Sequence, residues 1–288
     1  MEKINIINYY SKIIDEKKIT QSLTKEKITQ INGLIGSIKS IIFSASFLKF
    51  NKNFIFINSN KDDAISFIND LKELIPKENI FFFPESSNQN IDDKNYSMNL
   101  STRSKILSEL TITQSKKIIV TYPKAILNKL ISKKLIKKSE LNLDINTEVK
   151  LNYLQNYLFD NGYEINEFVT KPGDFSIRGG IFDIFSFSMK NPFRIEFSDD
   201  KIESIRLFDI NTQYSISKVN EIKIISNFDN VKFQKDDSLL EYFSSESSIW
   251  FDDIDYSLDF LKNESAKSNE YINYENLNLN LKKFNLVN

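Results

Sequence analysis

The stretch "KPGDFSIRGGIFDIFSFSMKNPFRIEFSDDKIESIRLFD", residues 171–209, is the most informative part of the sequence. Apolar and polar residues alternate along much of it, with the two-residue period of strands that bury one face. Tight turns are expected between these strands. The segment therefore predicts an antiparallel sheet, to which "NEIKIIS" (220–226) adds a further strand.

Charged residues of this segment gather on one side of the predicted sheet. In "FRIEF" (193–197) the apolar residues point to one face, whereas Arg194 and Glu196 point to the other. Arg178 ends a strand just before Gly179–Gly180, a pair that suggests a bulge or a close backbone approach. Any single charge could belong to a solvated face, but three on one motif suggest a binding surface.

The chain before this segment follows a different pattern. Continuous apolar runs, typical of buried parallel strands, alternate with stretches of helical spacing. The expected strands are 28–32, 53–59, 79–86 and 117–123, and the expected helices are 37–50, 61–75 and 101–111. This alternation predicts an α/β fold with a parallel sheet covered on both faces, as in half of a mononucleotide-binding fold.

The change of pattern divides the chain into parts. We expect a helical N-terminal arm over 1–27, the first part of the α/β domain over 28–129, and an inserted α+β domain with an antiparallel sheet over 130–228. Residues 229–288 return to the α/β domain, incomplete and with a frayed C-terminal end. The lysine-rich stretch 127–140 is expected to be a solvated linker helix, with a phosphate-contacting patch as the alternative.

Composition excludes several kinds of site. The sequence has no Cys and no His, which rules out a disulfide framework, a zinc cluster, a thiol nucleophile and a histidine base. Its net charge of −1 and pI of about 5.8 do not favour autonomous binding to nucleic acid. No secretory signal or membrane span is expected. The heavy use of Asn, Ile, Lys, Phe and Tyr suggests an AT-rich coding genome, and we expect a cytoplasmic bacterial protein.

The octapeptide "GLIGSIKS" (33–40) is close to a phosphate-binding loop, G-x-x-x-x-G-K-[ST]. Gly33, Lys39 and Ser40 fit that pattern, and Gly36 adds a second glycine, but Ile38 stands where the obligatory glycine belongs. A β-branched residue held at positive φ would cost about 1–3 kcal/mol and would crowd a phosphate. We therefore expect a degenerate nucleotide loop in which Lys39 clamps no phosphate, and a chance match is the alternative.

A second sign of a lost nucleotide site is "IWFDDID" (249–255). Asp252 and Asp253 follow an apolar strand, where a Walker B pair would hold Mg²⁺. Acidic residues at strand ends are common, so a structural or helix-capping role is the favoured interpretation of both.

The segment 171–209 closely resembles the interaction domain shared by UvrB and the transcription-repair coupling factors (Mfd). The resemblance lies in "PGDFSIRGGIFDIF", "PFRIEF", "DKIESIRLFD" and the following "TQ" (212–213), and it extends over roughly 28–260. The coupling factors fit better than UvrB, which keeps glycine in the place of Ile38 and uses ATP. The resemblance implies a degenerate RecA-like half domain that carries the inserted interaction domain.

In the resembled family this domain docks UvrA, the damage-sensing ATPase, through charged residues at the positions of Arg178, Arg194 and Glu196. The sequence departs from UvrB at Ser176, where UvrB has another arginine. Ser198 stands where many relatives have a second aromatic residue. Both departures suggest a reduced contact surface.

The resemblance implies a recruitment module without catalysis. RNA polymerase and damaged DNA would be reached only through family domains that this sequence lacks, and ATP and Mg²⁺ would belong to the missing motor, so no cofactor is expected. The alternatives are a UvrB-like, ATP-using repair protein and a decayed remnant that folds but binds nothing.

Overall fold

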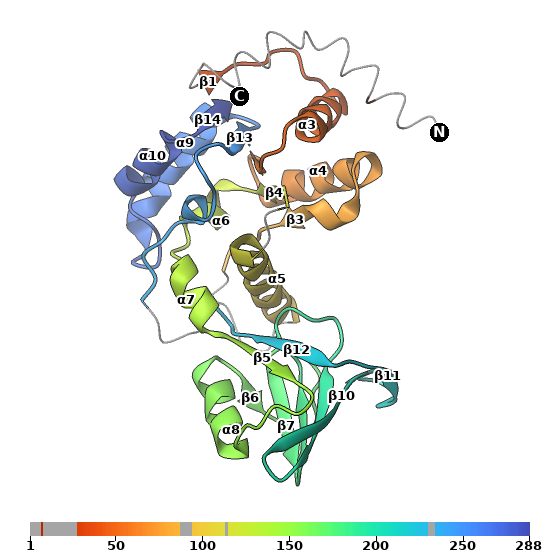
Figure 1. The fold of residues 1–288 in the computed structure, drawn as a ribbon. Coiled ribbons are helices and arrows are strands. Elements are labelled where there is room, and N and C mark those ends of the chain that lie inside the picture. The colour runs from red at the N-terminus through yellow and green to blue at the C-terminus, as the bar shows by residue number, and fades with distance from the viewer. Residues whose placement is uncertain (1–6, 8–27, 87–93, 113–114, 230–233) are drawn as a thin grey trace. The chain divides into compact units, whose positions relative to one another are not determined.

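The computed structural model describes residues 7, 28–86, 94–112, 115–229 and 234–288. The helical arm predicted over 1–27 lies outside this range except for Ile7. The chain divides into two compact units, each coloured along the sequence in Figure 1. The first comprises residues up to 85 with 113–129 and 236–288, and the second comprises 86–112 and 130–235.

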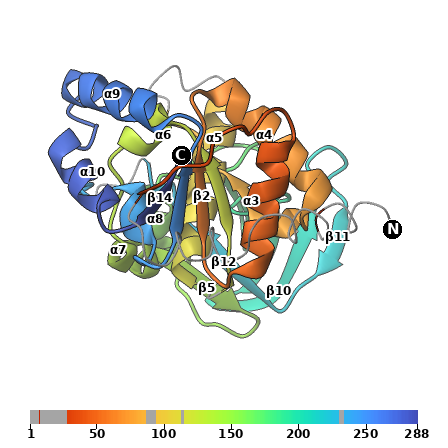
Figure 2. The same ribbon diagram turned by 90° about the horizontal axis from the view of Figure 1, so that it is seen from above.

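The first unit is built on a parallel sheet with the strand order β1-β14-β13-β2-β4-β3. Its strands are β1 (Ile28–Thr29), β2 (Phe54–Ile57), β3 (Ile80–Phe82), β4 (Ile118–Thr121), β13 (Ser248–Phe251) and β14 (Asn285–Val287). Its helices are α3 (Ile38–Lys49), α4 (Lys61–Leu74), α6 (Pro123–Leu127), α9 (Ile254–Glu264) and α10 (Tyr274–Leu281), with the 3₁₀ turns η1 (Lys77–Asn79), η2 (Leu239–Tyr242) and η3 (Ser265–Lys267). Figure 2 shows α3 and α4 on one side of this sheet and α9 and α10 on the other. The predicted parallel α/β fold is confirmed.

Aromatic packing forms the centre of this unit. Phe43 on α3 makes edge contacts with Phe54, Phe56, Phe67 and Trp250, at ring-centroid distances of 5.3–5.6 Å. Edge-to-face pairs of this kind each add about 0.5–1.5 kcal/mol beyond the burial of their area. The phenylalanine-rich composition therefore stabilises the sheet through α3 and α4.

The C-terminal stretch 273–288, which was predicted to fray because of its low complexity, forms helix α10 and strand β14. Helix α10 buries Leu277 and Leu281, and strand β14 pairs with β1 on one side and β13 on the other. Leu277 and Leu281 are four residues apart and so lie on the same side of the helix, whereas Leu279 between them is exposed. This end of the chain is therefore an integral part of the sheet.

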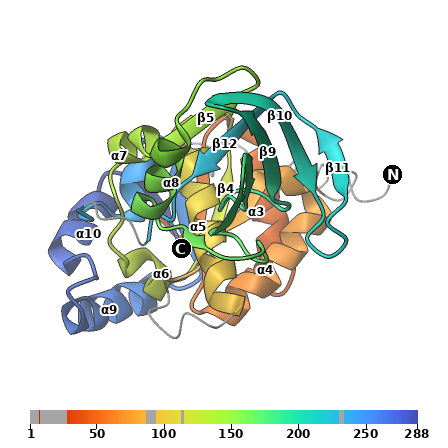
Figure 3. The same ribbon diagram turned by 90° about the horizontal axis from the view of Figure 1, so that it is seen from below.

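The second unit contains a six-stranded sheet with the order β11-β10-β9-β8-β7-β6, antiparallel except for the pair β6–β7. The strands are β6 (Glu164–Ile165), β7 (Asp174–Arg178), β8 (Ile181–Ile184), β9 (Phe193–Ser198), β10 (Lys201–Phe208) and β11 (Ser215–Lys218). A separate ribbon pairs β5 (Glu140–Asp144) with β12 (Glu221–Ile225), and the helices are α5 (Lys94–Ile112), α7 (Lys133–Lys138) and α8 (Leu151–Asp160). Figure 3 shows β9 and β10 side by side in this sheet.

One face of the six-stranded sheet is the core of the unit. Phe193 and Ile195 are fully buried there and pack with residues of α8, β5 and β12. The predicted assignment of the "FRIEF" faces is confirmed, since Arg194 and Glu196 lie on the opposite side. The pair Gly179–Gly180 forms the β7–β8 turn, and a Cβ on Gly180 would lie 2.8 Å from a backbone carbonyl oxygen of β9, which explains the close approach predicted from sequence.

Helix α5 and the lysine-rich stretch depart from the sequence-based division. Helix α5 falls in the second unit rather than in the first part of the α/β domain, and its fully buried Arg103 binds Asp229 through two nitrogens at 2.6 and 3.0 Å. The predicted linker helix over 127–140 is limited to α7 and is followed directly by β5. A charged residue thus anchors α5 to the segment that follows β12.

No helix within the described ranges is long and apolar enough to cross a membrane.

Candidate partner-binding site

The polar face of the six-stranded sheet is organised around one carboxylate. Asp183 on β8 is almost completely buried, with 2% of its side chain exposed. Its Oδ2 accepts a hydrogen bond from Arg178 Nη2 at 2.5 Å, while Arg194 donates through Nε and Nη2 at 2.7 and 2.9 Å. Arg194 faces Asp183 directly in the β8–β9 register. Two predicted site residues are therefore brought together by an acidic residue that the sequence analysis missed.

Arg194 contacts Phe208 and Gln213 in addition to Asp183. Its guanidinium lies 4.6 Å from the centre of the buried Phe208 ring, and it donates to Gln213 Oε1 at 3.3 Å. The hydrogen bond to Asp183 raises the pKa of Arg194 further above its ordinary value, so this side chain is always charged. Gln213 adopts a φ of 62°, a conformation that costs a residue with a side chain some free energy. The Arg194 guanidinium therefore makes most of its contacts within the domain.

Glu196 is paired within the domain. Its carboxylate accepts hydrogen bonds from Ser204 Oγ at 2.6 Å and from Arg206 Nη2. Both partners lie on β10, where Ser204 is opposite Glu196 in the register. This predicted site residue therefore presents a neutral ion pair with Arg206 rather than a free negative charge.

Arg178 is the most exposed member of the network, with 46% of its side chain accessible, against 23% for Arg194. Within the described part of the chain, hydrogen bonding occupies only its Nη2. Arginine carries five N–H donors in a rigid fork that matches a carboxylate. The network therefore holds Arg178 from one edge and leaves its other donors available to a partner.

The two departures from the family pattern have different structural consequences. Ser176 is buried on β7 and donates its hydroxyl to the backbone carbonyl of Glu167 at 3.0 Å. Ser198 is exposed at the end of β9. Ser176 therefore holds the loop that contains Glu167, whereas Ser198 provides no aromatic side chain at the end of β9.

In the first unit, the degenerate loop lies between β1 and α3. Gly33 and Gly36 have φ values of +83° and +60°, which only glycine adopts readily. Ile38 is the first residue of α3 and is not among the described residues with positive φ. The strain expected for Ile38 is therefore absent, because the left-handed turn falls on Gly36 instead.

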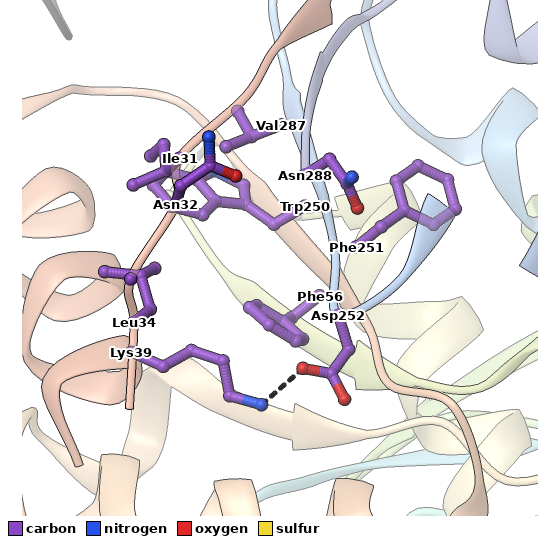
Figure 4. Close-up of a pocket in the computed structure, with 11 residues that line it drawn as sticks. Ile31, Asn32, Leu34, Lys39, Phe56, Trp250, Phe251, Asp252, Val287 and Asn288 are labelled. Atoms are coloured by element: carbon purple, nitrogen blue, oxygen red, sulfur yellow. Dashed lines mark hydrogen bonds and ion pairs between the residues drawn. The ribbon is translucent and has the colours of Figure 1, made fainter. Parts of the chain in front are cut away.

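Lys39 points toward Asp252 and forms an ion pair with it, as Figure 4 shows. Its Nζ lies 2.5 Å from Asp252 Oδ1 and sits over the rings of Phe56 and Phe67, at 5.7 and 5.8 Å. Asp252 also accepts a hydrogen bond from Ser59 Oγ at 3.3 Å. One ion pair thus connects the two segments, 33–40 and 249–255, in which the sequence suggested a lost nucleotide site.

A cavity of about 240 Å³ lies beside this ion pair. Its lining includes Asn32, Leu34, Trp250 and Asn288, which Figure 4 labels. Two other residues of the predicted motifs have local roles. Ser40 Oγ donates to the backbone carbonyl of Ser37 at 2.9 Å, and Asp253 caps α9 by accepting from the backbone N–H of Tyr256 at 2.9 Å.

Comparison with known proteins assigns the second unit. Residues 141–229 match the family described as the UvrB interaction domain. The matched segment contains all six strands of the antiparallel sheet and the network around Asp183. The strand β5 lies at its start and Asp229, the partner of Arg103, at its end.

The chain is also similar over most of its length to transcription-repair-coupling factors. It is 32% identical to the one from Rickettsia bellii over 212 residues, which is 71% of this chain and 19% of the relative. It is 30% identical to the one from Bacillus subtilis over 225 residues, which is 76% of this chain and 19% of the relative. A Staphylococcus aureus relative is 28% identical over 70% of this chain. The chain therefore spans about a fifth of the length of the curated relatives it matches.

Proposed function

We propose that this chain is the module of a transcription-repair coupling factor that recruits UvrA, and that it does so without catalysis of its own. The interaction domain and the coupling-factor relatives support the module. The observation that carries the UvrA contact is Arg178, which is exposed and still has hydrogen-bond donors to offer. RNA polymerase and damaged DNA would be reached through other parts of a coupling factor, in the bacterial cytoplasm.

The mechanism of recognition follows from the network. Asp183 fixes the position of the Arg178 guanidinium before a partner arrives, so little side-chain entropy is lost on binding. The remaining N–H groups of Arg178 can then receive a carboxylate of the partner in a bidentate arrangement. Arg194 holds the Asp183 carboxylate in place, and the Glu196–Arg206 pair adds a polar rim.

Titration calorimetry of the chain against its cognate UvrA tests this proposal. Arg178→Glu reverses the exposed charge, and loss of a buried interfacial charge partner costs about 2–5 kcal/mol. We expect the dissociation constant to rise by at least tenfold. Lys134→Glu on α7 is the matched control, because it makes the same charge change at an exposed site on another element, and it should leave the affinity unchanged.

Arg178 is a cleaner test than Arg194. Substitution of Arg194 would remove two of the three hydrogen bonds to the buried Asp183 and the contact with the Phe208 ring, whereas substitution of the more exposed Arg178 removes one hydrogen bond. Equal affinities of Arg178→Glu and the unsubstituted chain would refute the predicted face. Failure of a folded, unsubstituted chain to bind UvrA would instead favour the decayed remnant.

For the first unit we propose descent from a RecA-like nucleotide-binding domain that no longer binds nucleotide. The parallel sheet has the loop after β1 and the aspartates after β13, both at the carboxyl ends of strands, where ligands bind in open α/β sheets. The Lys39–Asp252 ion pair uses the two groups that would otherwise serve phosphate and Mg²⁺. This argues against the alternative of a UvrB-like, ATP-using protein.

The nucleotide proposal can be tested with Trp250, the sole tryptophan of the chain, which lines the cavity beside Lys39. We expect no change in its fluorescence on addition of ATP and Mg²⁺ up to millimolar concentration, and no heat in a parallel calorimetric titration. Saturable binding that Lys39→Met abolishes would contradict the proposal and would favour the ATP-using alternative.

A further inference from the structure

We infer that Phe168 is a second anchor of the partner-binding face, one that contacts an apolar group next to the carboxylate bound by Arg178. The inference rests on the proposed function and specifies the chemistry of the partner surface. Phe168 lies on the loop between β6 and β7, outside every strand of the sheet, and it is not among the residues predicted from the sequence to bind the partner.

The loop that carries Phe168 is held in one conformation by a buried carboxylate. Asp174 accepts hydrogen bonds from the backbone N–H groups of Thr170 and Lys171, both at 2.9 Å, and from Asn166 Nδ2 at 2.9 Å. Asp174 is 1% exposed, and the Ser176 hydroxyl binds the carbonyl of the residue just before Phe168. An exposed aromatic ring is thus presented on a fixed loop, so little freedom is lost when it is covered.

Phe168 stands directly beside the exposed arginine. The Arg178 guanidinium lies 5.4 Å from the centre of the Phe168 ring, within the range of a cation–π contact. The ring therefore borders the place where the free donors of Arg178 would receive a carboxylate. A partner that satisfies Arg178 must also meet this ring.

Phe168 and Phe208 each contact an arginine, but they differ in how far they are exposed. Phe208 stacks under Arg194 in the same way, but it is buried in a small apolar cluster with Val169 and Phe185. Phe168 keeps 50% of its surface exposed although its neighbour Val169 enters that cluster. Large aromatic side chains that become buried beside a charged pair are typical of binding hot spots.

The chemistry of the partner follows from charge and surface. Arg178 and Arg194 share the single carboxylate of Asp183, so this part of the face has one positive charge in excess, and it is concentrated at the exposed Arg178. The complementary surface offers a carboxylate with an aliphatic or aromatic side chain next to it. A partner that is acidic but lacks the apolar neighbour should bind more weakly.

The test compares Phe168→Ala and Phe168→Tyr with the unsubstituted chain in calorimetric titrations against UvrA. We expect Phe168→Ala to raise the dissociation constant about tenfold, and Phe168→Tyr, which keeps the ring, to change it less than threefold. The matched control is Tyr153→Ala, which removes an aromatic ring that is 56% exposed on α8, the helix that packs on the opposite face of the sheet. It should not alter the affinity.

Salt dependence separates an apolar contact from an indirect effect on Arg178. If Phe168 touches the partner directly, Phe168→Ala weakens binding equally at low and high salt, whereas Arg178→Ala reduces the salt dependence itself. Loss of salt dependence in Phe168→Ala would overturn the direct contact. Equal affinities of Phe168→Ala and the unsubstituted chain would overturn this inference alone, while absence of UvrA binding by the unsubstituted chain would overturn the proposed function as well.

Discussion

Replacement of Asp183 by asparagine should destabilise the second unit strongly, although it removes no atom from the core. The carboxylate is nearly fully buried and accepts three hydrogen bonds from two arginines. Asparagine keeps the volume but loses the charge, and its amide group offers N–H donors to guanidinium groups that are themselves only donors. The two arginines are then left facing each other without a counter-charge.

The magnitude follows from the burial of the three groups. Removal of one member of a buried ion pair costs about 3–5 kcal/mol when the other stays buried and unpaired. Here Arg178 and Arg194 are 46% and 23% exposed, so water replaces part of the lost bonding. We therefore expect the free energy of unfolding to fall by about 2–4 kcal/mol, with the lower end set by the net value of a hydrogen bond to a charged group.

Urea denaturation followed by circular dichroism, together with hydrogen exchange of β7–β10, would measure this loss. With a urea dependence of about 2 kcal/mol per molar, the midpoint should fall by about 1–2 M. Fluorescence of Trp250, which lies in the first unit, reports that unit separately in the same samples. Glu203→Gln, an exposed carboxylate on β10, is the matched control and should change stability by less than about 0.5 kcal/mol. A midpoint of Asp183→Asn equal to that of the control would refute the role given to the buried carboxylate.

Three further predictions concern stability. Arg103→Met leaves the buried carboxylate of Asp229 unpaired and should lower the free energy of unfolding by about 3–5 kcal/mol, measured by urea denaturation; a loss below 1 kcal/mol would contradict the pairing. Lys116→Met removes hydrogen bonds to three carbonyls at the end of α3 and should lower the free energy of unfolding by about 1–2 kcal/mol in melts followed by Trp250 fluorescence; an unchanged melt would contradict a stabilising role of these bonds. Hydrogen bonds from the backbone N–H and the hydroxyl of Thr212 lower the pKa of Asp209 in the folded state. The ionised Asp209 therefore stabilises the fold above about pH 4, and this stabilisation is lost as the pH falls through the folded-state pKa. Asp209→Asn should therefore weaken the acid dependence of stability between pH 5 and pH 3, and an unchanged dependence would exclude this contribution.

The sequence predicted the layers of the fold because the relevant signals are local. Continuous apolar runs identified β2 and β4, and the two-residue period of 171–209 identified β7 to β10. The register of those strands depends on turn geometry and on cross-strand packing, which a pattern does not contain. Asp183 was missed for this reason: "IFDIF" reads as an apolar strand with one polar interruption, and only the register with β9 shows that the interruption faces Arg194.

The errors at the edges of the units have the same physical origin. The lysines of 133–138 marked a polar helix but did not indicate that the next residues form β5, whose partner β12 lies about 80 residues later in the sequence. The local sequence of helix α5 does not show to which unit the helix belongs. The buried Arg103 binds Asp229, 126 residues later in the sequence, and this contact is made within the second unit. The C-terminal stretch 273–288 was predicted to fray because its strand β14 is formed by pairing with the distant strands β1 and β13, which the local sequence does not show.

The arrangement of the charged face explains how a chain with a net charge of −1 can present a specific site for an acidic partner. An overall basic surface would attract any polyanion, including nucleic acid. Here Glu196 and Asp183 neutralise two of the three arginines, and the most exposed of the three is Arg178, whose guanidinium is held by the buried carboxylate. A partner gains from this site only if its own carboxylate lies where those donors point. The pairing of arginines with carboxylates of the same domain therefore weakens long-range electrostatic attraction of polyanions, and it favours discrimination between partners.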